Sequence, residues 1–258
     1  NYQFEMSSPI TAEKSCSRLS THLTYGTISH RTVFQEAAKK RDQIKHTNKN
    51  FAKSINSFLS RLHWRSHFIQ KLEDQPSIEH TSFIPVYDQI REKDDEKLEA
   101  WIEGKTGVHF IDACMIYLRN YGWINFRMRA MLASFASYNL WLDWRYFAPR
   151  LAALFTDFEP GIHYSQIQMQ SGTTGINTIR MYNPYKQAMD QDPLGKFIKS
   201  QIPEVKNFSP VFFHNPPKKS SNINLFDNEV QKEIINVKET AQYARKKIFD
   251  IRKSEEHK

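Results

Sequence analysis

The sequence predicts an all-α fold, and three features of its 258 residues support this class. Apolar side chains recur at steps of three and four residues in several segments, which is the spacing of one helix face. Only eight glycines occur, too few for the tight turns of a β-sandwich, a barrel or a doubly wound sheet. The chain is 40% hydrophobic and 25% charged, as globular proteins are. With no internal repeat or low-complexity linker, we expect one multi-helical domain over residues 1–258, with long loops.

The first part of the chain is predicted to begin irregularly and then to form two helices. Residues 1–26 are rich in Ser and Thr, whose hydroxyl groups compete with helical hydrogen bonds. A helix is predicted from Thr27, with Ser29 as its N-cap. A second helix is predicted over residues 51–72 because five apolar residues share one face: Phe51, Ile55, Phe58, Leu59 and Leu62.

The middle of the chain is predicted to contain a loop followed by two helices. Residues 74–95 carry Pro76, Pro85 and scattered charges, a composition that is typical of a surface loop. A helix over residues 111–120 is predicted after the turn "EGKTG". Residues 122–145, "GWINFRMRAMLASFASYNLWLDWR", are mostly apolar and are predicted to form one long helix.

The last part of the chain is predicted to be loop-rich until a closing helix. Residues 157–195 hold several glycines and prolines and are expected to form loops. The closing helix is predicted to begin near Asp227. Its apolar stripe of about three heptads is short for a coiled coil and favours docking onto the body of the domain. The stripe comprises Val230, Ile234, Val237, Ala241, Ala244, Ile248 and Ile251.

Charge and cysteine content limit the classes of partner and compartment. A net charge of +8 and a pI near 9.3 favour a polyanionic partner, although simple solubility explains the charge equally well. The two cysteines, Cys16 and Cys114, form neither a disulfide framework nor a metal quartet, so we expect a reducing, cytoplasmic compartment. No signal peptide and no apolar run of about 18 residues is recognisable, which predicts no membrane attachment. The ten histidines lack metal-ligand spacing, so no metal site is expected.

The predicted helix over residues 122–145 carries two arginines where apolar side chains would be expected. On an ideal helix Arg129 shares a face with Leu132, Ala133 and Ala136, so it is predicted to point inward. A buried guanidinium requires a carboxylate or phosphate, because an unpaired buried charge costs several kcal/mol. The alternative is an arginine that extends to the surface along its aliphatic stem.

Several longer motifs resemble one family in sequence and in order. They are "SRLSTHLTYGTIS", "AWIEGKTG", "GWINFRMRAMLASF", "LWLDWR", "RMYNPYKQAMDQDPLGKFI" and "PEV", and the closing segment with "AQYARKKI" fits as well. This order is similar to that of the FAD-binding domain of the photolyase/cryptochrome family, and the resemblance covers nearly the whole chain. It implies a helical domain that binds FAD, from which the family's N-terminal α/β antenna domain is missing.

The resemblance also implies which residues hold the FAD. Arg129 corresponds to a family arginine that pairs with an aspartate beside the flavin, and Asp157 corresponds to that aspartate. His163 corresponds to the residue facing flavin N5, where titration near neutral pH would tune the flavin; the alternative is a loop histidine without such a role. The complete set of implied FAD-binding residues is Tyr2, Ser17, Arg18, Leu19, Ser20, Phe58, Arg65, Arg129, Asp157, Glu159 and His163.

A pocket for flipped DNA bases is implied as well, with several departures from the family pattern. Trp64 corresponds to a tryptophan that stacks on the flipped bases, and Arg127 and Arg180 correspond to arginines near the DNA. At three other DNA-pocket positions the family residue is replaced: Arg61 stands for a glutamate, Phe126 for an asparagine, and Met169 for a second stacking tryptophan.

The family's tryptophan chain for photoreduction is only partly kept. Ile167 replaces the tryptophan nearest the flavin, whereas Trp144 keeps the middle position. Tyr164, Trp141 together with Trp144, or a diffusible reductant are the candidate electron donors. The implied catalytic residues are therefore Trp64, His163 and Trp144.

Three functions remain open at this point. The first is light-driven repair of DNA photolesions, which Trp64, Arg127, Arg180 and the net charge favour. The second is a cryptochrome-like blue-light photoreceptor, which the replacements at Arg61, Phe126, Ile167 and Met169 favour. The third is a flavoprotein fragment without activity of its own. The persistence of basic character without the α/β domain favours the first.

Overall fold

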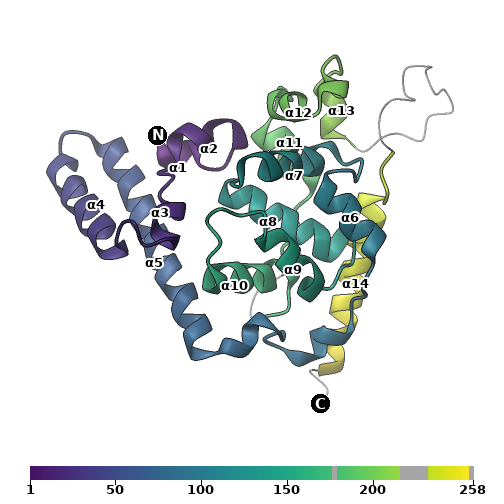
Figure 1. The fold of residues 1–258 in the computed structure, drawn as a ribbon. Coiled ribbons are helices and arrows are strands. Elements are labelled where there is room, and N and C mark those ends of the chain that lie inside the picture. Colours follow the sequence, from purple (N-terminus) through teal and green to yellow (C-terminus); the bar gives the residue numbers. More distant parts are fainter. Residues whose placement is uncertain (176–178, 216–231, 256–258) are drawn as a thin grey trace.

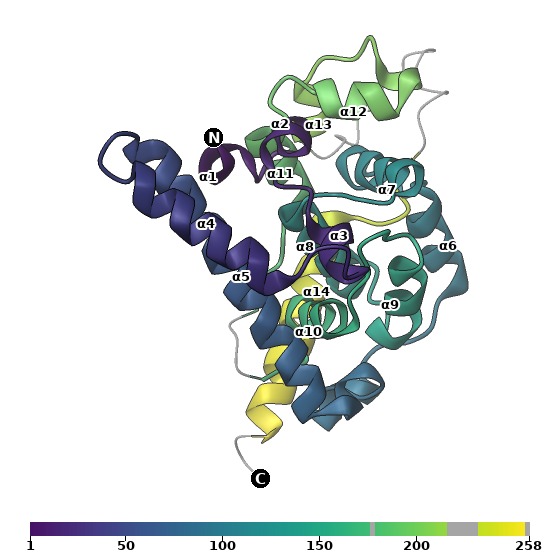
Figure 2. The same ribbon diagram turned by 60° about the vertical axis from the view of Figure 1, so that its left-hand side comes forward.

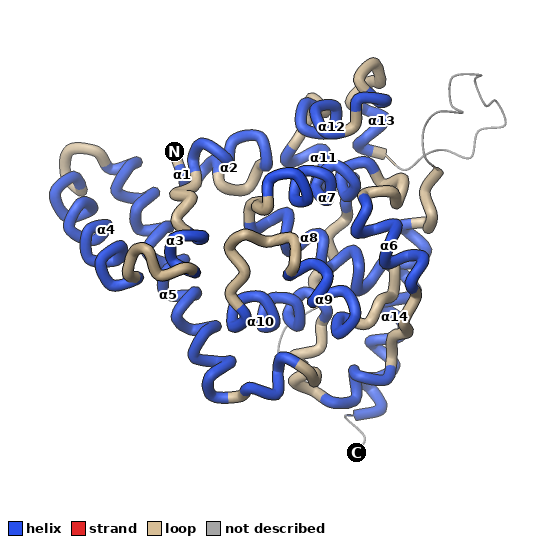
Figure 3. The backbone as a smooth tube through the Cα atoms, in the orientation of Figure 1, coloured by secondary structure: helices blue, strands red, loops and turns tan. Residues whose placement is uncertain are grey.

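The computed structural model describes residues 1–175, 179–215 and 232–255, and in these ranges the chain is helical (Figure 1; Figure 3). No strand occurs in these ranges; the one isolated bridge joins Glu92 to Leu142. The predicted all-α class is therefore confirmed.

Residues 1–26 form three short helices rather than the predicted irregular segment. These are α1 (Tyr2–Glu5), α2 (Pro9–Ser15) and α3 (Ser20–Thr24). The hydroxyl groups lie at a helix end instead of opposing the helix: the Ser8 side chain accepts a hydrogen bond from the amide of Ile10, with Pro9 in the first turn.

Helices α4 (His30–Ile44) and α5 (Lys49–Asp74) form an antiparallel hairpin that extends from one side of the domain (Figure 1; Figure 2). Ser29 caps α4 as predicted, because its side chain accepts from the amide of Thr32. The hairpin has its own apolar cluster, in which the buried residues are Val33, Ile55, Leu59 and Leu62.

The predicted loop over residues 74–95 contains two 3₁₀ turns, η1 (Pro76–Glu79) and η2 (Pro85–Gln89). It is followed by α6 (Asp95–Glu103), which the sequence did not predict, and by α7 (His109–Tyr121), which confirms the predicted helix over residues 111–120. The turn between α6 and α7 is fixed by the buried Asp112 carboxylate, which accepts hydrogen bonds from the amides of Thr106 and Gly107.

The prediction of one long helix over residues 122–145 is wrong. The segment contains α8 (Phe126–Ser134), the π-helical turn η3 (Phe135–Asn139) and the start of α9 (Trp144–Ala152). The Leu140 amide bonds to the carbonyl of Phe135, five residues back, and Trp141 then adopts a left-handed conformation with φ 58°. Such a residue ends a right-handed helix.

Residues 157–195 contain two helices as well as loops, so the predicted loop-rich segment is only partly correct. They contain α10 (Pro160–Ser171) and α11 (Pro184–Gln191), and α12 (Lys196–Gln201), η4 (Pro203–Val205) and α13 (Val211–His214) follow. The prolines and glycines lie at the helix ends: Pro160 opens α10 and the left-handed Gly172 ends it.

The closing helix α14 (Val237–Glu255) docks onto the domain, as expected from its short apolar stripe (Figure 1). Val237, Ala244 and Ile248 of the stripe are buried, and α14 packs against η3. The expected start at Asp227, with Val230, lies outside the described residues.

The main core joins α7, α8, α9 and α10 beneath the cap formed by α11 and α12. Across the described ranges, no helix combines the length and the apolar character that crossing a lipid bilayer would require.

Helix α10 approaches α5 so closely that only glycine fits at the contact. A Cβ atom on Gly161 would lie 2.7 Å from the Cα atom of Ile69 and 2.9 Å from the carbonyl oxygen of Phe68. This contact fixes the first turn of α10 against the C-terminal part of α5.

We therefore expect Gly161→Ala to destabilise the protein, although the same change at an open helical position stabilises. Helix propensity alone would add about 0.5–1 kcal/mol to the free energy of unfolding. Overpacking against backbone atoms removes typically about 1–3 kcal/mol, so a net loss is expected. Urea unfolding followed by circular dichroism measures the sign, and a variant more stable than the parent would contradict the close approach.

Candidate functional site

An ion pair links the start of α8 to the loop before α10. The Nη2 atom of Arg129 lies 2.8 Å from Oδ2 of Asp157, and the Nε atom donates to the carbonyl of Ile124 at 2.7 Å. The guanidinium also stands 4.2 Å from the ring centroid of Phe155. The Asp157 side chain is 3% exposed and that of Arg129 is 26% exposed. Arg129 is thus paired with a buried carboxylate rather than extended into solvent, as predicted.

The second oxygen of the Asp157 carboxylate makes no hydrogen bond to the described residues. Oδ1 of Asp157 is buried and has no hydrogen-bond partner among the residues that the structure describes. Such an atom costs about 1–3 kcal/mol if nothing donates to it. The Nε atom of Arg127, on the first turn of α8, is also buried and unpartnered within the described ranges. Asp157 therefore offers a buried acceptor to a ligand.

His163 lies on the second turn of α10 and is buried. Its Nε2 atom is 2.9 Å from the carbonyl oxygen of Ala148, and because a carbonyl only accepts, Nε2 carries the proton and Nδ1 is an acceptor. Burial, together with the positive charge of Arg129, lowers the pKa of His163 to about 4. The expectation that His163 titrates near neutral pH is therefore wrong: the ring is neutral, and Nδ1 can only accept a hydrogen bond from a ligand.

The segment "SCSRLS" forms the turn between α2 and α3. Arg18 has a φ of 58° and places its guanidinium 3.9 Å from the ring centroid of Trp123. Ser17 and Arg18 are exposed, whereas Leu19 packs against the apolar cluster of the α4–α5 hairpin, and Ser20 opens α3. The turn presents hydroxyl and amide groups, which suits an anion such as phosphate.

Four further residues of the implied FAD set join α5 to its neighbours. The Nη2 atom of Arg65 lies 3.0 Å from Oε2 of Glu159, at the N-cap of α10, and 3.4 Å from the carbonyl of Leu23. Phe58 meets Tyr2 edge to face, with ring centroids 6.0 Å apart. Burial raises the pKa of Tyr2 to about 12. Arg65 is therefore engaged by a carboxylate, although the resemblance implies a phosphate.

The residues implied in DNA contact lie on four elements. Trp64 and Arg61 are exposed on α5, and Trp64, 48% exposed, stacks on Phe68 at a centroid distance of 5.6 Å. The other members are Phe126 (51% exposed) and Arg127 on α8, the half-buried Met169 on α10, and the exposed Arg180. An exposed tryptophan in a domain of buried ones indicates an interaction surface.

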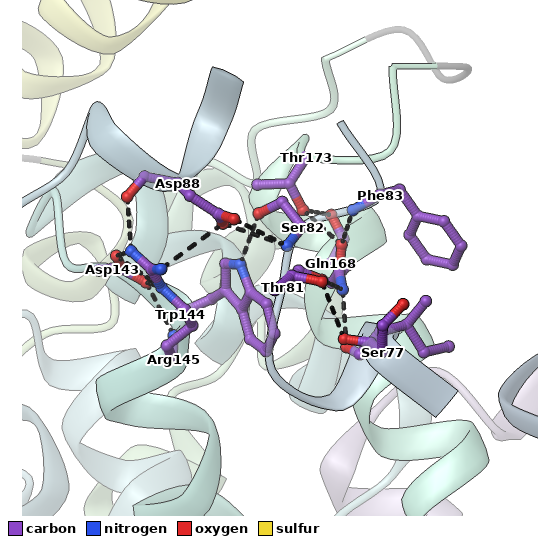
Figure 4. Close-up of polar contacts among 11 residues, drawn as sticks. Ser77, Thr81, Ser82, Phe83, Asp88, Asp143, Trp144, Arg145, Gln168 and Thr173 are labelled. Carbon is purple, nitrogen blue, oxygen red and sulfur yellow. Dashed lines mark hydrogen bonds and ion pairs between the residues drawn. The ribbon is translucent and has the colours of Figure 1, made fainter. Parts of the chain in front are cut away.

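Trp144 is buried and held by a polar network (Figure 4). Its Nε1 atom donates to the Ser82 hydroxyl at 2.9 Å, and the Ser82 amide donates to the carboxylate of Asp88. The indole meets the ring of Tyr164 at a centroid distance of 6.4 Å, and Tyr164 meets the ring of His163 at 5.3 Å. A row of aromatic rings thus runs from His163 to Trp144.

Gln168 holds the loop that carries Ser82, and sequence reasoning missed this residue (Figure 4). Its Nε2 atom donates to the carbonyls of Ile78 and Thr81, and its Oε1 atom accepts from the amide of Phe83. These partners lie 85 or more residues away in the sequence, so no local sequence pattern predicts the contact.

These features describe a helical domain with a buried ion pair and an exposed polar turn between α2 and α3. Residues 58–257 match the family described as the FAD binding domain of DNA photolyase. The chain belongs to this family, and FAD is its cofactor. The expected family is therefore confirmed.

The chain resembles curated proteins over part of their length. It is 30% identical over 203 residues to a deoxyribodipyrimidine photo-lyase of Streptomyces griseus, covering 78% of this chain and 42% of that protein. It is also 30% identical over 222 residues to that of Escherichia coli K12, covering 84% of this chain and 46% of the relative. The chain thus spans less than half the length of these relatives.

Solved structures agree on the fold. An archaeal photolyase from Sulfolobus tokodaii with two FAD molecules aligns with a TM-score of 0.77 at 28% identity, covering 97% of this chain and 53% of that one. A Synechocystis cryptochrome aligns with a TM-score of 0.83 at 23% identity, covering 95% and 51%. The second likeness shows the fold alone.

The pKa of His163 predicts a dependence of stability on pH. Because the folded pKa of about 4 lies below the ordinary 6.5, the unfolded chain binds more protons between these values. The histidine's contribution is fully present above about pH 6.5 and is lost as the pH falls towards 4. The loss amounts to about 3 kcal/mol at most. Denaturant unfolding across this range should give a flatter profile for His163→Asn, and parallel profiles would contradict the buried neutral ring.

We expect Arg129→Ala to weaken FAD binding by tenfold or more, about 1.4 kcal/mol, because it leaves Asp157 as an unpaired buried charge. Titration of the apoprotein with FAD, followed by flavin fluorescence, measures the dissociation constant. Arg150→Ala is the matched control, since it breaks an exposed ion pair with Glu99 at 2.6 Å. Equal FAD affinities of the two variants would remove Arg129 from the flavin site.

Proposed function

We propose that this chain is the FAD-binding half of a light-dependent photolyase that repairs photolesions in DNA. The observation that carries the proposal is the buried Arg129–Asp157 pair, with one carboxylate oxygen left for a ligand, in a chain of this family. The relatives named above are deoxyribodipyrimidine photo-lyases. We extend that activity to this chain as a proposal.

The residues around the ion pair would hold the flavin and keep water away from it. Asp157 supplies a buried acceptor and Arg129 a fixed positive charge, which suits a flavin that carries negative charge. His163 accepts through Nδ1 without adding charge, because its ring is neutral. Ser17, Arg18 and Ser20 would bind the pyrophosphate. The Arg65–Glu159 pair positions the start of α10 rather than binding phosphate directly.

When bound, reduced FAD supplies an electron to a substrate upon excitation by blue light. The protein contributes orientation and a dry, preorganised site for that chemistry. Trp144 and Tyr164 form a buried ring pair, and we propose that this pair is the electron donor within the protein for reduction of the flavin.

Substrate recognition would use the exposed face of α5 and the start of α8. Trp64 offers its exposed ring to a flipped base, while Arg127 and Arg180 suit contacts with phosphates. Arg61, Phe126 and Met169 give this pocket a different chemistry from the family pattern, which suggests a lesion other than the usual one or a different mode of stacking. The remaining part of the protein would supply an α/β antenna domain.

The test is light-driven repair. With FAD, a reductant and an oligonucleotide containing a thymine dimer, we expect blue light to remove the dimer. Trp64→Ala should weaken lesion binding by about 5- to 150-fold, because one base–aromatic stack contributes roughly 1–3 kcal/mol. The matched control is Phe249→Ala, which removes an exposed ring on α14.

The outcomes separate the three functions. Loss of dimers that depends on Trp64 supports repair. Flavin photoreduction without loss of either the thymine dimer or the 6–4 photoproduct overturns repair and supports a photoreceptor, and a yellow protein inert to blue light leaves only the flavoprotein fragment. A 6–4 photoproduct oligonucleotide is tested in parallel, since the altered pocket residues affect the choice of lesion.

A further inference from the structure

The tip of the α4–α5 hairpin concentrates the positive charge of the chain. Residues 39–53 contain six basic side chains and one acidic side chain, so this segment supplies five of the eight net positive charges. The acidic residue, Asp42, is already paired with Arg41 at 3.0 Å. The remaining basic side chains are all exposed: Lys39, Lys40, Lys45, Lys49 and Lys53.

Among the described residues, no carboxylate lies within ion-pair distance of these lysines, although Lys45 is near enough to Asp42 to help lower the pKa of that carboxyl group. None of the five forms an ion pair with any residue that the structure describes. The hairpin projects from the body in two views, so its tip is open to a large partner (Figure 1; Figure 2). Like charges held this close repel one another, and a polyanion relieves that repulsion.

The hairpin is built to hold the tip in a fixed place. Its two helices enclose their own apolar cluster around Val33, Ile55 and Leu59. Another side of α5 is buried against α1, where the amide of Gln3 donates to the Ser54 hydroxyl at 3.4 Å. The charged tip is therefore a rigid extension of the domain rather than a loose arm.

One exposed stripe of α5 connects this tip to the proposed DNA pocket. Steps of four and three residues lead from the tip to the exposed Trp64 along one helix face. All members of the stripe are exposed: Lys49, Lys53, Asn56, Ser60, Trp64 and His67. At 1.5 Å per residue, Lys49 lies about 22 Å from Trp64 along the helix.

We propose that the tip of the α4–α5 hairpin binds the phosphate backbone of duplex DNA beside the lesion. This inference rests on the proposed function, since it needs DNA at Trp64. A duplex that runs along α5 would reach the tip about six base pairs from the flipped base, at about 3.4 Å per base pair. The lysines would neutralise phosphates without reading sequence. They would add affinity and orientation, while the pocket selects the lesion.

The test removes positive charge from the hairpin tip while it keeps the helix propensity of the segment. The triple variant Lys40→Gln/Lys45→Gln/Lys49→Gln keeps good helix formers and removes three charges. The matched control, Lys196→Gln/Lys199→Gln/Lys206→Gln, removes three charges around α12, which lies away from the hairpin (Figure 1). Fluorescence anisotropy measures the affinity for duplexes extending about three or about ten base pairs on each side of a thymine dimer, over a range of salt concentrations.

For the long duplex, we expect the hairpin variant to lower the slope of log affinity against log salt by about two to three, because each lost phosphate contact removes about 0.9. For the short duplex, the parent and the hairpin variant should have equal slopes. The control should behave as the parent with both duplexes. Equal slopes for the parent and hairpin variants on the long duplex, or an equal loss on the short one, would overturn the proposal.

The same experiment separates this inference from the repair function. An undamaged long duplex carries the same backbone, so the hairpin effect on the slope should persist there. If light removes no dimers but the hairpin variant still lowers the slope, repair fails and the hairpin surface stands. If dimers are removed and the slopes are equal, repair stands and the hairpin surface fails.

Discussion

The ion pair between Arg129 and Asp157 constrains the rest of the site, because the Asp157 carboxylate is withdrawn from bulk water and neither group forms a second ion pair within the part of the chain that the structure describes. Burying two charges costs more than their attraction returns unless geometry and further hydrogen bonds are good. Here the guanidinium also donates to Ile124 and lies over Phe155, whereas the carboxylate keeps one oxygen free. This free oxygen, in a chain of the FAD-binding family, is available to a ligand.

Helix α10 transmits this constraint to the surrounding elements. Its first turn is fixed against α5 by the close approach at Gly161 and by the Arg65–Glu159 pair. Its second turn carries His163, and its last turn carries Gln168, which secures the loop around Ser82. One helix therefore positions the neutral histidine, the loop that hydrogen-bonds Trp144, and Met169 of the residues implied in DNA contact. A shift of α10 would disturb all three together, which favours a rigid site.

Prediction from sequence succeeded where the signal is local. The cap at Ser29 and the turn "EGKTG" before α7 are readable within a few residues, and both helices are present. The break after α8 was not predictable, because a π-turn and the left-handed Trp141 have no residue signature such as glycine or proline. Gly172, which ends α10, and Pro184, which opens α11, were misread as loop residues, although they delimit helices.

The candidate site was predictable only in part, for the same physical reason. Arg129 was expected to have an anionic partner from helix geometry alone, but Asp157 was identified through the resemblance, since the fold brings them together across 28 residues. The neutral state of His163 depends on burial, which sequence does not give.

The residues of the flavin site and the excess positive charge of the chain lie in different parts of the molecule. The site contains two ion pairs, Arg129–Asp157 and Arg65–Glu159, and a neutral histidine. Five of the eight net positive charges stand on residues 39–53, and Lys49 in this segment lies about 22 Å along α5 from Trp64. At physiological ionic strength this distance exceeds the Debye length of about 8 Å, so the charge of Lys49 is largely screened at Trp64. Affinity for a polyanion can therefore change through substitution of Lys49 with little electrostatic effect on Trp64.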